Sequence, residues 1–184
     1  DAIFGESANA LARFRTDLKD IQDQIIKVED GVRKSFGGKY NDFILSKYKQ
    51  MVYLIQKEYE SNPNSKAVNP AADFLKKTIK RLKKGDTKYT SYDIEMLQSI
   101  LKDYSVDGDI NIDNLWKSFN AAEKESIKTI HSINSSLEEL AMITSTLIRG
   151  EEFTPLKNYA HLNVLTDEGN IDVMSTDAFI ESLN

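Results

Sequence analysis

A stripe of apolar residues between Leu11 and Val32 constrains the fold of this chain more than any other feature. Its members are spaced alternately by three and four residues, as are the a and d positions of a heptad repeat. They are Leu11, Phe14, Leu18, Ile21, Ile25, Val28 and Val32. Because a helix brings such residues to one face, the stripe predicts a helix over about residues 6–35, ended by Gly37-Gly38.

A second long helix is expected over residues 113–149, followed by Gly150. Its heptad positions are Trp116, Phe119, Ile130, Ile133, Leu137, Leu140 and Leu147, with Glu123, Ser126 and Thr144 interrupting the stripe. Two such helices are natural antiparallel or crossing partners, and a stripe too long for its partners in the chain requires a second chain. We therefore expect either internal packing of the two helices or contact with a protein partner or another copy.

Three shorter helices are expected between these two, over residues 41–61, 70–84 and 91–102, where apolar residues recur at helical spacing. Asn69 and Pro70 are typical of the N-cap and the first helical position. The sequence thus predicts an all-α fold, an elongated helical bundle over residues 1–150 with two long heptad-patterned helices. Residues 151–184 are expected to form a small irregular extension or arm, with a β-hairpin over residues 161–174 as one form.

Composition excludes several classes of protein. The chain has no Cys, which excludes disulfide frameworks, thiolate metal sites and cysteine nucleophiles. No stretch approaches the roughly 18 apolar residues of a membrane span, and no signal peptide is visible, so we expect a soluble protein of unknown location. Because the chain begins with Asp1 and not Met, we also expect it to be either a processed product or a segment of a larger protein or assembly.

Residues 103–114 carry the sharpest local motif, a loop rich in Asp, Asn and Gly. It places short oxygen-bearing side chains at alternate positions and Gly108 at the sixth, where calcium loops need a sharp turn. The segment therefore resembles an EF-hand or dockerin-type calcium loop over about a dozen residues. The resemblance implies Ca²⁺ as a cofactor, with Asp103, Ser105, Asp107, Asp109 and Asn114 as the metal site.

The loop departs from that family at its twelfth position, where Asn114 replaces the Glu that supplies two oxygens. No convincing second loop is present to pair with it. The alternative is a polar turn between two helices, with Asp113 capping the second of them.

A dense group of cations lies in the third expected helix, opposite its apolar residues. The group comprises Lys76, Lys77, Lys80, Arg81, Lys83, Lys84 and, beyond the helix, Lys88. Such a surface over residues 76–88 can bind the phosphates of nucleic acid or an anionic surface. The alternative is a solvated helix face neutralised by acidic helices, because no aromatic residue interleaves the lysines to stack on bases. The net charge of −5 conceals a +5 segment over residues 70–90.

No catalytic motif is present. His131 and His161 have no partner pattern, and neither a Gly-x-Ser-x-Gly elbow nor a phosphate loop occurs. Exposed Tyr53 beside Met51 is interpreted either as a contact surface or as the edge of the core. We therefore expect a non-enzymatic interaction or scaffold module. The alternatives are a calcium-binding helix–loop–helix module and a basic-helix binder of nucleic acid or an anionic surface.

Overall fold

The computed structural model describes residues 2–85 and 90–149 of the 184-residue chain. Its described part is mostly helical, which agrees with the predicted all-α class. It also contains one antiparallel strand pair, which that class does not include. The elements are α1 (Ala2–Ser35), α2 (Tyr40–Ser61), α3 (Ala71–Gly85), α4 (Thr90–Tyr104), β1 (Ser105–Val106), β2 (Asp109–Ile110), α5 (Ile112–Ser118) and α6 (Ala121–Arg149). The extension expected over residues 151–184, with its hairpin, lies outside the described residues.

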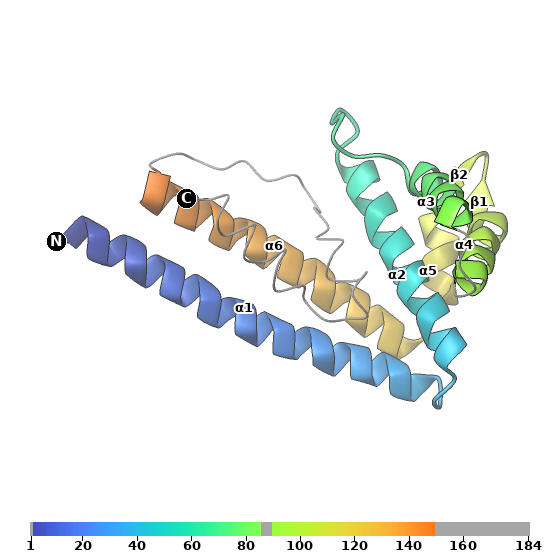
Figure 1. Cartoon of the computed structure of the whole chain (residues 1–184), viewed down its shortest axis with the longest axis horizontal. Helices are drawn as coiled ribbons and strands as arrows, with labels where there is room; N and C mark the ends of the chain where they lie inside the picture. Colours follow the sequence, from blue (N-terminus) through green and yellow to red (C-terminus); the bar gives the residue numbers. More distant parts are fainter. Residues whose placement is uncertain (1, 86–89, 150–184) are drawn as a thin grey trace. The chain divides into compact units, whose positions relative to one another are not determined.

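The chain divides into two compact units. Of the described residues, the first unit comprises 2–31 and 128–149, and the second comprises 32–85 and 90–127. In the first unit α1 and α6 run antiparallel (Figure 1). Ile21, Ile25 and Ile133 form a buried cluster there, with Leu18 packed against it. The expected contact between the first and the last long helix is present at these four residues.

In the second unit α2 is the common support, because α3, α4 and α5 all contact it (Figure 1). α3 and α4 also pack against each other, and β2 contacts α3. Leu75 of α3, Leu97 of α4 and Leu115 of α5 are each 0% exposed. Since full burial of a Leu side chain contributes roughly 1.5–3 kcal/mol, these three residues hold three helices in one core.

The prediction of a single long helix over residues 113–149 is wrong, because the structure divides that stretch into α5 and α6. Phe119 ends α5 with extended backbone angles (φ −78°, ψ 140°). Asn120 then begins α6: its Oδ1 accepts a hydrogen bond from the N–H of Glu123, and Glu123 Oε1 accepts one from the N–H of Asn120, both at 2.8 Å. This reciprocal capping box satisfies backbone donors that have no helical partner, so a new helix begins there.

Glu123 also binds α2 and is only 3% exposed. Ser46 Oγ donates to Glu123 Oε2 at 2.6 Å and accepts from Gln50 Nε2 at 3.0 Å. Asn120 Nδ2 donates to Ser35 Oγ at 3.1 Å. A chain of polar side chains therefore joins the end of α1, α2 and the start of α6 inside the second unit.

Candidate functional site

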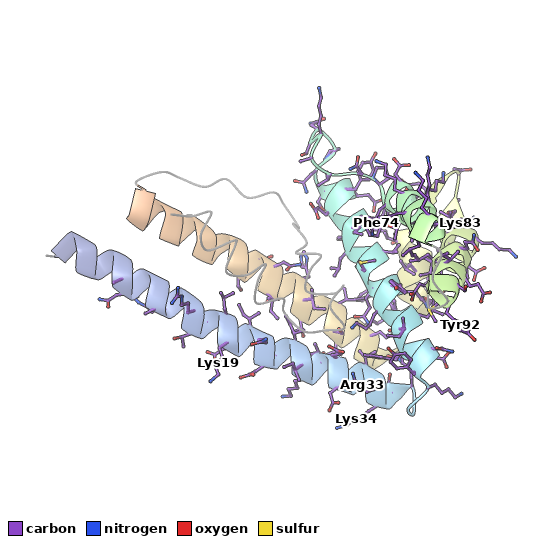
Figure 2. The ribbon with its side chains drawn as sticks, in the orientation of Figure 1. Lys19, Arg33, Lys34, Phe74, Lys83 and Tyr92 are labelled. Carbon is purple, nitrogen blue, oxygen red and sulfur yellow. The ribbon has the colours of Figure 1, made fainter. Side chains whose placement is uncertain are left out.

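The outer face of α3 carries six cations, and every one of them is exposed. This basic face consists of Lys76, Lys77, Lys80, Arg81, Lys83 and Lys84. Figure 2 shows Lys83 pointing away from α3. The six cations against Asp73 give α3 a net charge of +5. Lys88, the seventh cation of the sequence analysis, lies outside the described residues.

The opposite face of α3 is buried, as its apolar spacing predicts. Ala71 and Leu75 are 0% exposed, Ala72 is 2% and Ile79 is 8% exposed. This face packs against α2, α4 and β2. The basic face is therefore presented by a helix whose other side is fixed in the core.

The first turn of α3 is held by a side chain from α2 and not by the predicted Asn69 cap. The N–H of Ala71 donates to Gln56 Oε1 at 2.9 Å, and Gln56 Nε2 donates to Asp109 Oδ2 at 3.1 Å. Gln56 is 1% exposed, so its hydrogen bond to Ala71 is shielded from water, and its hydrogen bond to Asp109 is partly shielded. Gln56 thus links the start of α3 to the β-hairpin. Local sequence patterns could not predict these hydrogen bonds, because Gln56 is far from both partners in the sequence.

No acidic partner neutralises the basic face within the described part of the chain, where none of its six cations makes an ion pair. The acidic side chains are concentrated in the elements that follow. Residues 90–118 hold six carboxylates against Lys102 and Lys117, a net charge of −4. Within the second unit α3 is therefore strongly basic and residues 90–118 are acidic, and no ion pair joins the basic face to described residues of that stretch.

The candidate calcium loop, residues 103–114, contains a β-hairpin over residues 105–110. Ser105 pairs with Ile110 and Val106 with Asp109, which leaves a two-residue turn. Asp107 (φ 54°) and Gly108 (φ 85°) occupy that turn with positive φ. Positive φ at both central residues is typical of a type I′ turn, for which Asp-Gly is a preferred dipeptide.

The five candidate metal ligands lie on five different parts of this segment. Asp103 is exposed in α4, Ser105 is in β1, Asp107 is in the turn, Asp109 is in β2 and Asn114 is exposed in α5. Among the described residues no group of three or more His, Asp or Glu side chains is arranged to hold a metal ion. Calcium binding by this segment stays a prediction.

Hydrogen bonds within the protein already use several oxygens of the segment. Asp109 Oδ1 accepts from the N–H of Ile110 at 2.9 Å, and its Oδ2 accepts from Gln56. Asn111 Oδ1 accepts from the N–H of Asn114 at 3.0 Å, so Asn111, and not the expected Asp113, caps the helix that follows. Calcium ligation by Asp109 would have to compete with these hydrogen bonds.

Tyr53 is part of an aromatic cluster and is half-buried. Its ring centroid lies 5.3 Å from that of Trp116 and 6.1 Å from that of Phe119. Lys49 Nζ lies 5.3 Å from the Phe119 centroid, and Lys124 Nζ lies 5.5 Å from that of Trp116. Burial, then the charge of Asp113 and that of Glu60, raise the pKa of Tyr53. This arrangement favours the interpretation of Tyr53 as the edge of the core.

One of the two histidines lies within the described residues. His131 is half-buried in α6, and His161 lies outside the described residues. No described helix is both long enough and apolar enough to cross a lipid bilayer.

No family model, curated protein or solved structure matches this chain.

Proposed function

We propose that this chain is a non-enzymatic interaction module that binds a polyanionic partner with the basic face of α3. The observation that carries the proposal is that all six cations are exposed and none makes an ion pair within the described residues. The rigid attachment of α3 to α2, α4 and β2 supports it further. A surface that is fixed before binding loses little conformational freedom when a partner arrives.

The spacing of the cations adds a physical reason for a partner. Lys76 and Lys80 are four residues apart, as are Lys77 and Arg81, and Lys80 and Lys84. Like charges at this spacing destabilise a helix by about 0.2–0.5 kcal/mol per pair. Burial of the apolar face of α3 offsets this repulsion in the free protein, and a polyanion would relieve it.

Binding to immobilised heparin, a generic polyanion, tests the proposal. We expect the wild-type chain to be retained and the combined variant Lys76→Glu, Lys80→Glu, Lys84→Glu to elute at much lower salt. A matched control carries Arg15→Glu, Lys19→Glu and Lys27→Glu, which reverse three exposed cations of α1 and give the same net charge. Circular dichroism verifies that both variants remain helical.

Retention of the α3 variant equal to that of the wild type would refute the proposal. Equal loss in the α1 control would refute it as well, because net charge and not the basic face would then control binding. Failure of the wild type to bind heparin would have the same meaning.

Self-association through the heptad helices is a second proposal, with another copy of this chain as the partner. Ile26 of α1 lies beside the heptad stripe and supports this proposal, because this large apolar side chain is 47% exposed. Light scattering at increasing protein concentration tests it, and a monomer mass throughout would exclude it.

A further inference from the structure

We infer that the polyanion bound by α3 is the phosphate backbone of a duplex nucleic acid, contacted without reading its sequence. This inference rests on the proposed function and specifies its partner. It is built from the composition of the basic face, the burial of the rest of α3 and the separation of charge in the second unit.

The composition of the basic face does not suit a protein partner. Five of its six cations are Lys, and no apolar side chain lies among its exposed residues. The centres of protein–protein interfaces are depleted in Lys and contain aromatic or aliphatic anchors. Interfaces with nucleic acid are instead polar and strongly positive.

The burial of α3 does not suit insertion into a lipid surface. A helix that binds in the membrane interface buries its apolar face among the acyl chains. In α3 that face is already occupied, since Leu75 is 0% exposed and Ile79 is 8% exposed. The basic face can therefore attract a membrane by charge but cannot insert into it. Charge attraction is sufficient for binding to the phosphate backbone of a nucleic acid.

The dimensions of the basic face agree with a duplex backbone. Its cations extend from Lys76 to Lys84, about 12 Å along the axis at 1.5 Å per residue. A duplex presents one negative charge per 1.7 Å of axis with both strands counted, or one per 3.4 Å on each strand. Over about 12 Å the six cations therefore face about four phosphates of the nearer strand and are enough to neutralise them.

The residue types on the face favour backbone contact over base reading. Lys acts as a point charge on phosphate, and Arg81 is the single residue of the six with a planar fork that suits a guanine edge. No aromatic residue lies between the cations to stack on an unpaired base. We therefore expect duplexes of unrelated sequence to bind alike, and single strands to bind no better.

The charge separation in the second unit favours approach of a duplex to α3. α3 has a net charge of +5, and residues 90–118 have a net charge of −4. A phosphate backbone is attracted to the former and repelled by the latter, so the field of the unit directs the duplex to α3.

Fluorescence anisotropy with labelled 20-base-pair duplexes of two unrelated sequences tests the inference on the full chain. Each phosphate contact contributes about 0.9 to the slope of log K against log salt. We expect a slope between about −3 and −5 for the wild type, for about four to six phosphate contacts, and the same affinity for both sequences. The variant Lys76→Glu, Lys80→Glu, Lys84→Glu should lose at least tenfold in affinity and flatten the slope by about 2.7, for three contacts.

Two controls separate backbone contact from other effects. Tyr92 of α4 is 63% exposed, and Tyr92→Ser should leave the affinity unchanged because no base stacking is involved. The Arg15→Glu, Lys19→Glu, Lys27→Glu variant of α1 should also bind duplexes as the wild type does, apart from a uniform effect of net charge.

Competing polyanions distinguish the possible failures. If poly-L-glutamate or vesicles of anionic phospholipid bind at the α3 face and duplexes do not, the inference is overturned and the proposed function stands. If none of these polyanions binds, both are overturned. A more than tenfold preference for one sequence, or for a single strand, would overturn the inference of backbone contact.

Discussion

Gln56 Nε2 donates a hydrogen bond to Asp109 Oδ2 at 3.1 Å, although the two residues are 53 positions apart. Oε1 of the same side chain accepts a hydrogen bond from the N–H of Ala71 at 2.9 Å. The element with the basic face and the element that resembles a calcium loop thus share one buried amide of α2. Substitution at position 56 therefore affects both.

We predict that Gln56→Leu destabilises the chain by about 1–3 kcal/mol, because it removes the acceptor of the Ala71 N–H and the donor to Asp109 Oδ2. Urea denaturation monitored by circular dichroism measures the loss. Gln98→Leu is the matched control, since Gln98 is exposed in α4 and should change stability by less than about 0.5 kcal/mol. Equal stability of the two variants would show that the Gln56 hydrogen bonds are not structural.

Glu123→Ala is predicted to cost about 1–3 kcal/mol, because it removes the capping box of α6 and leaves the buried Ser46 hydroxyl without its acceptor. Glu125→Ala, at an exposed position of the same helix, serves as the control. Combining Glu123→Ala with Ser46→Ala isolates the pair: the costs should be less than additive, because the second change removes the unpaired hydroxyl. Additive costs would indicate that Ser46 and Glu123 act independently.

Tyr48 should make stability depend on alkaline pH. Its hydroxyl donates to Asp93 Oδ1 at 2.9 Å, and burial, followed by this hydrogen bond, raises its pKa above the usual value of 10.0. The unfolded chain therefore releases this proton at lower pH than the folded chain does. Its contribution to stability is complete below about pH 10 and is lost as the pH rises further.

We accordingly expect Tyr48→Phe to be less stable than the wild type by about 1 kcal/mol at pH 8, through loss of the hydrogen bond to Asp93. The difference should shrink between pH 10 and 11, where urea denaturation can follow it. Tyr92→Phe, at a 63% exposed position, controls for the loss of one tyrosine and should track the wild type. A difference that stays constant with pH would contradict the assignment to Tyr48.

Gly108 and Gly31 are predicted to respond to alanine in opposite directions. Gly108→Ala places a side chain at φ +85° and should cost about 1–2 kcal/mol. Gly31 lies inside α1, where an added Cβ meets nothing within 4 Å, so Gly31→Ala should stabilise the chain by about 0.5–1 kcal/mol. Thermal unfolding measures both. Equal shifts would mean that the hairpin turn is not the conformation that Gly108 adopts in solution.

Apolar periodicity predicted well those helices that bury one face and expose the other. The periodicity over residues 41–61, 70–84 and 91–102 placed α2, α3 and α4 to within about two residues at each end. The basic face was also visible, because cations opposite an apolar stripe must point outward on a helix. In these cases neighbouring residues carry the whole signal.

The break between α5 and α6 and the β-hairpin were missed for a different reason. Their signals were present as Asn120-x-x-Glu123, a capping pair, and Asp107-Gly108, a preferred dipeptide of two-residue hairpins. Each competed with another local reading, a heptad stripe that continues through Phe119 and an oxygen pattern typical of calcium loops. Packing of Phe119 against Tyr53, and the hydrogen bond from Gln56 to Asp109, favour the observed forms.

The chain's own pattern of apolar and charged residues thus accounts for its helical character and for the position of its cations, since both depend on neighbours within a turn or two. Which of those cations stay unpaired, where the longest predicted helix ends and which side chain caps α3 depend on residues far apart in sequence. A buried hydrogen bond such as that between Gln56 and Ala71 forms when folding brings its partners together and excludes water. The spacing of residues along the chain does not predict such a contact.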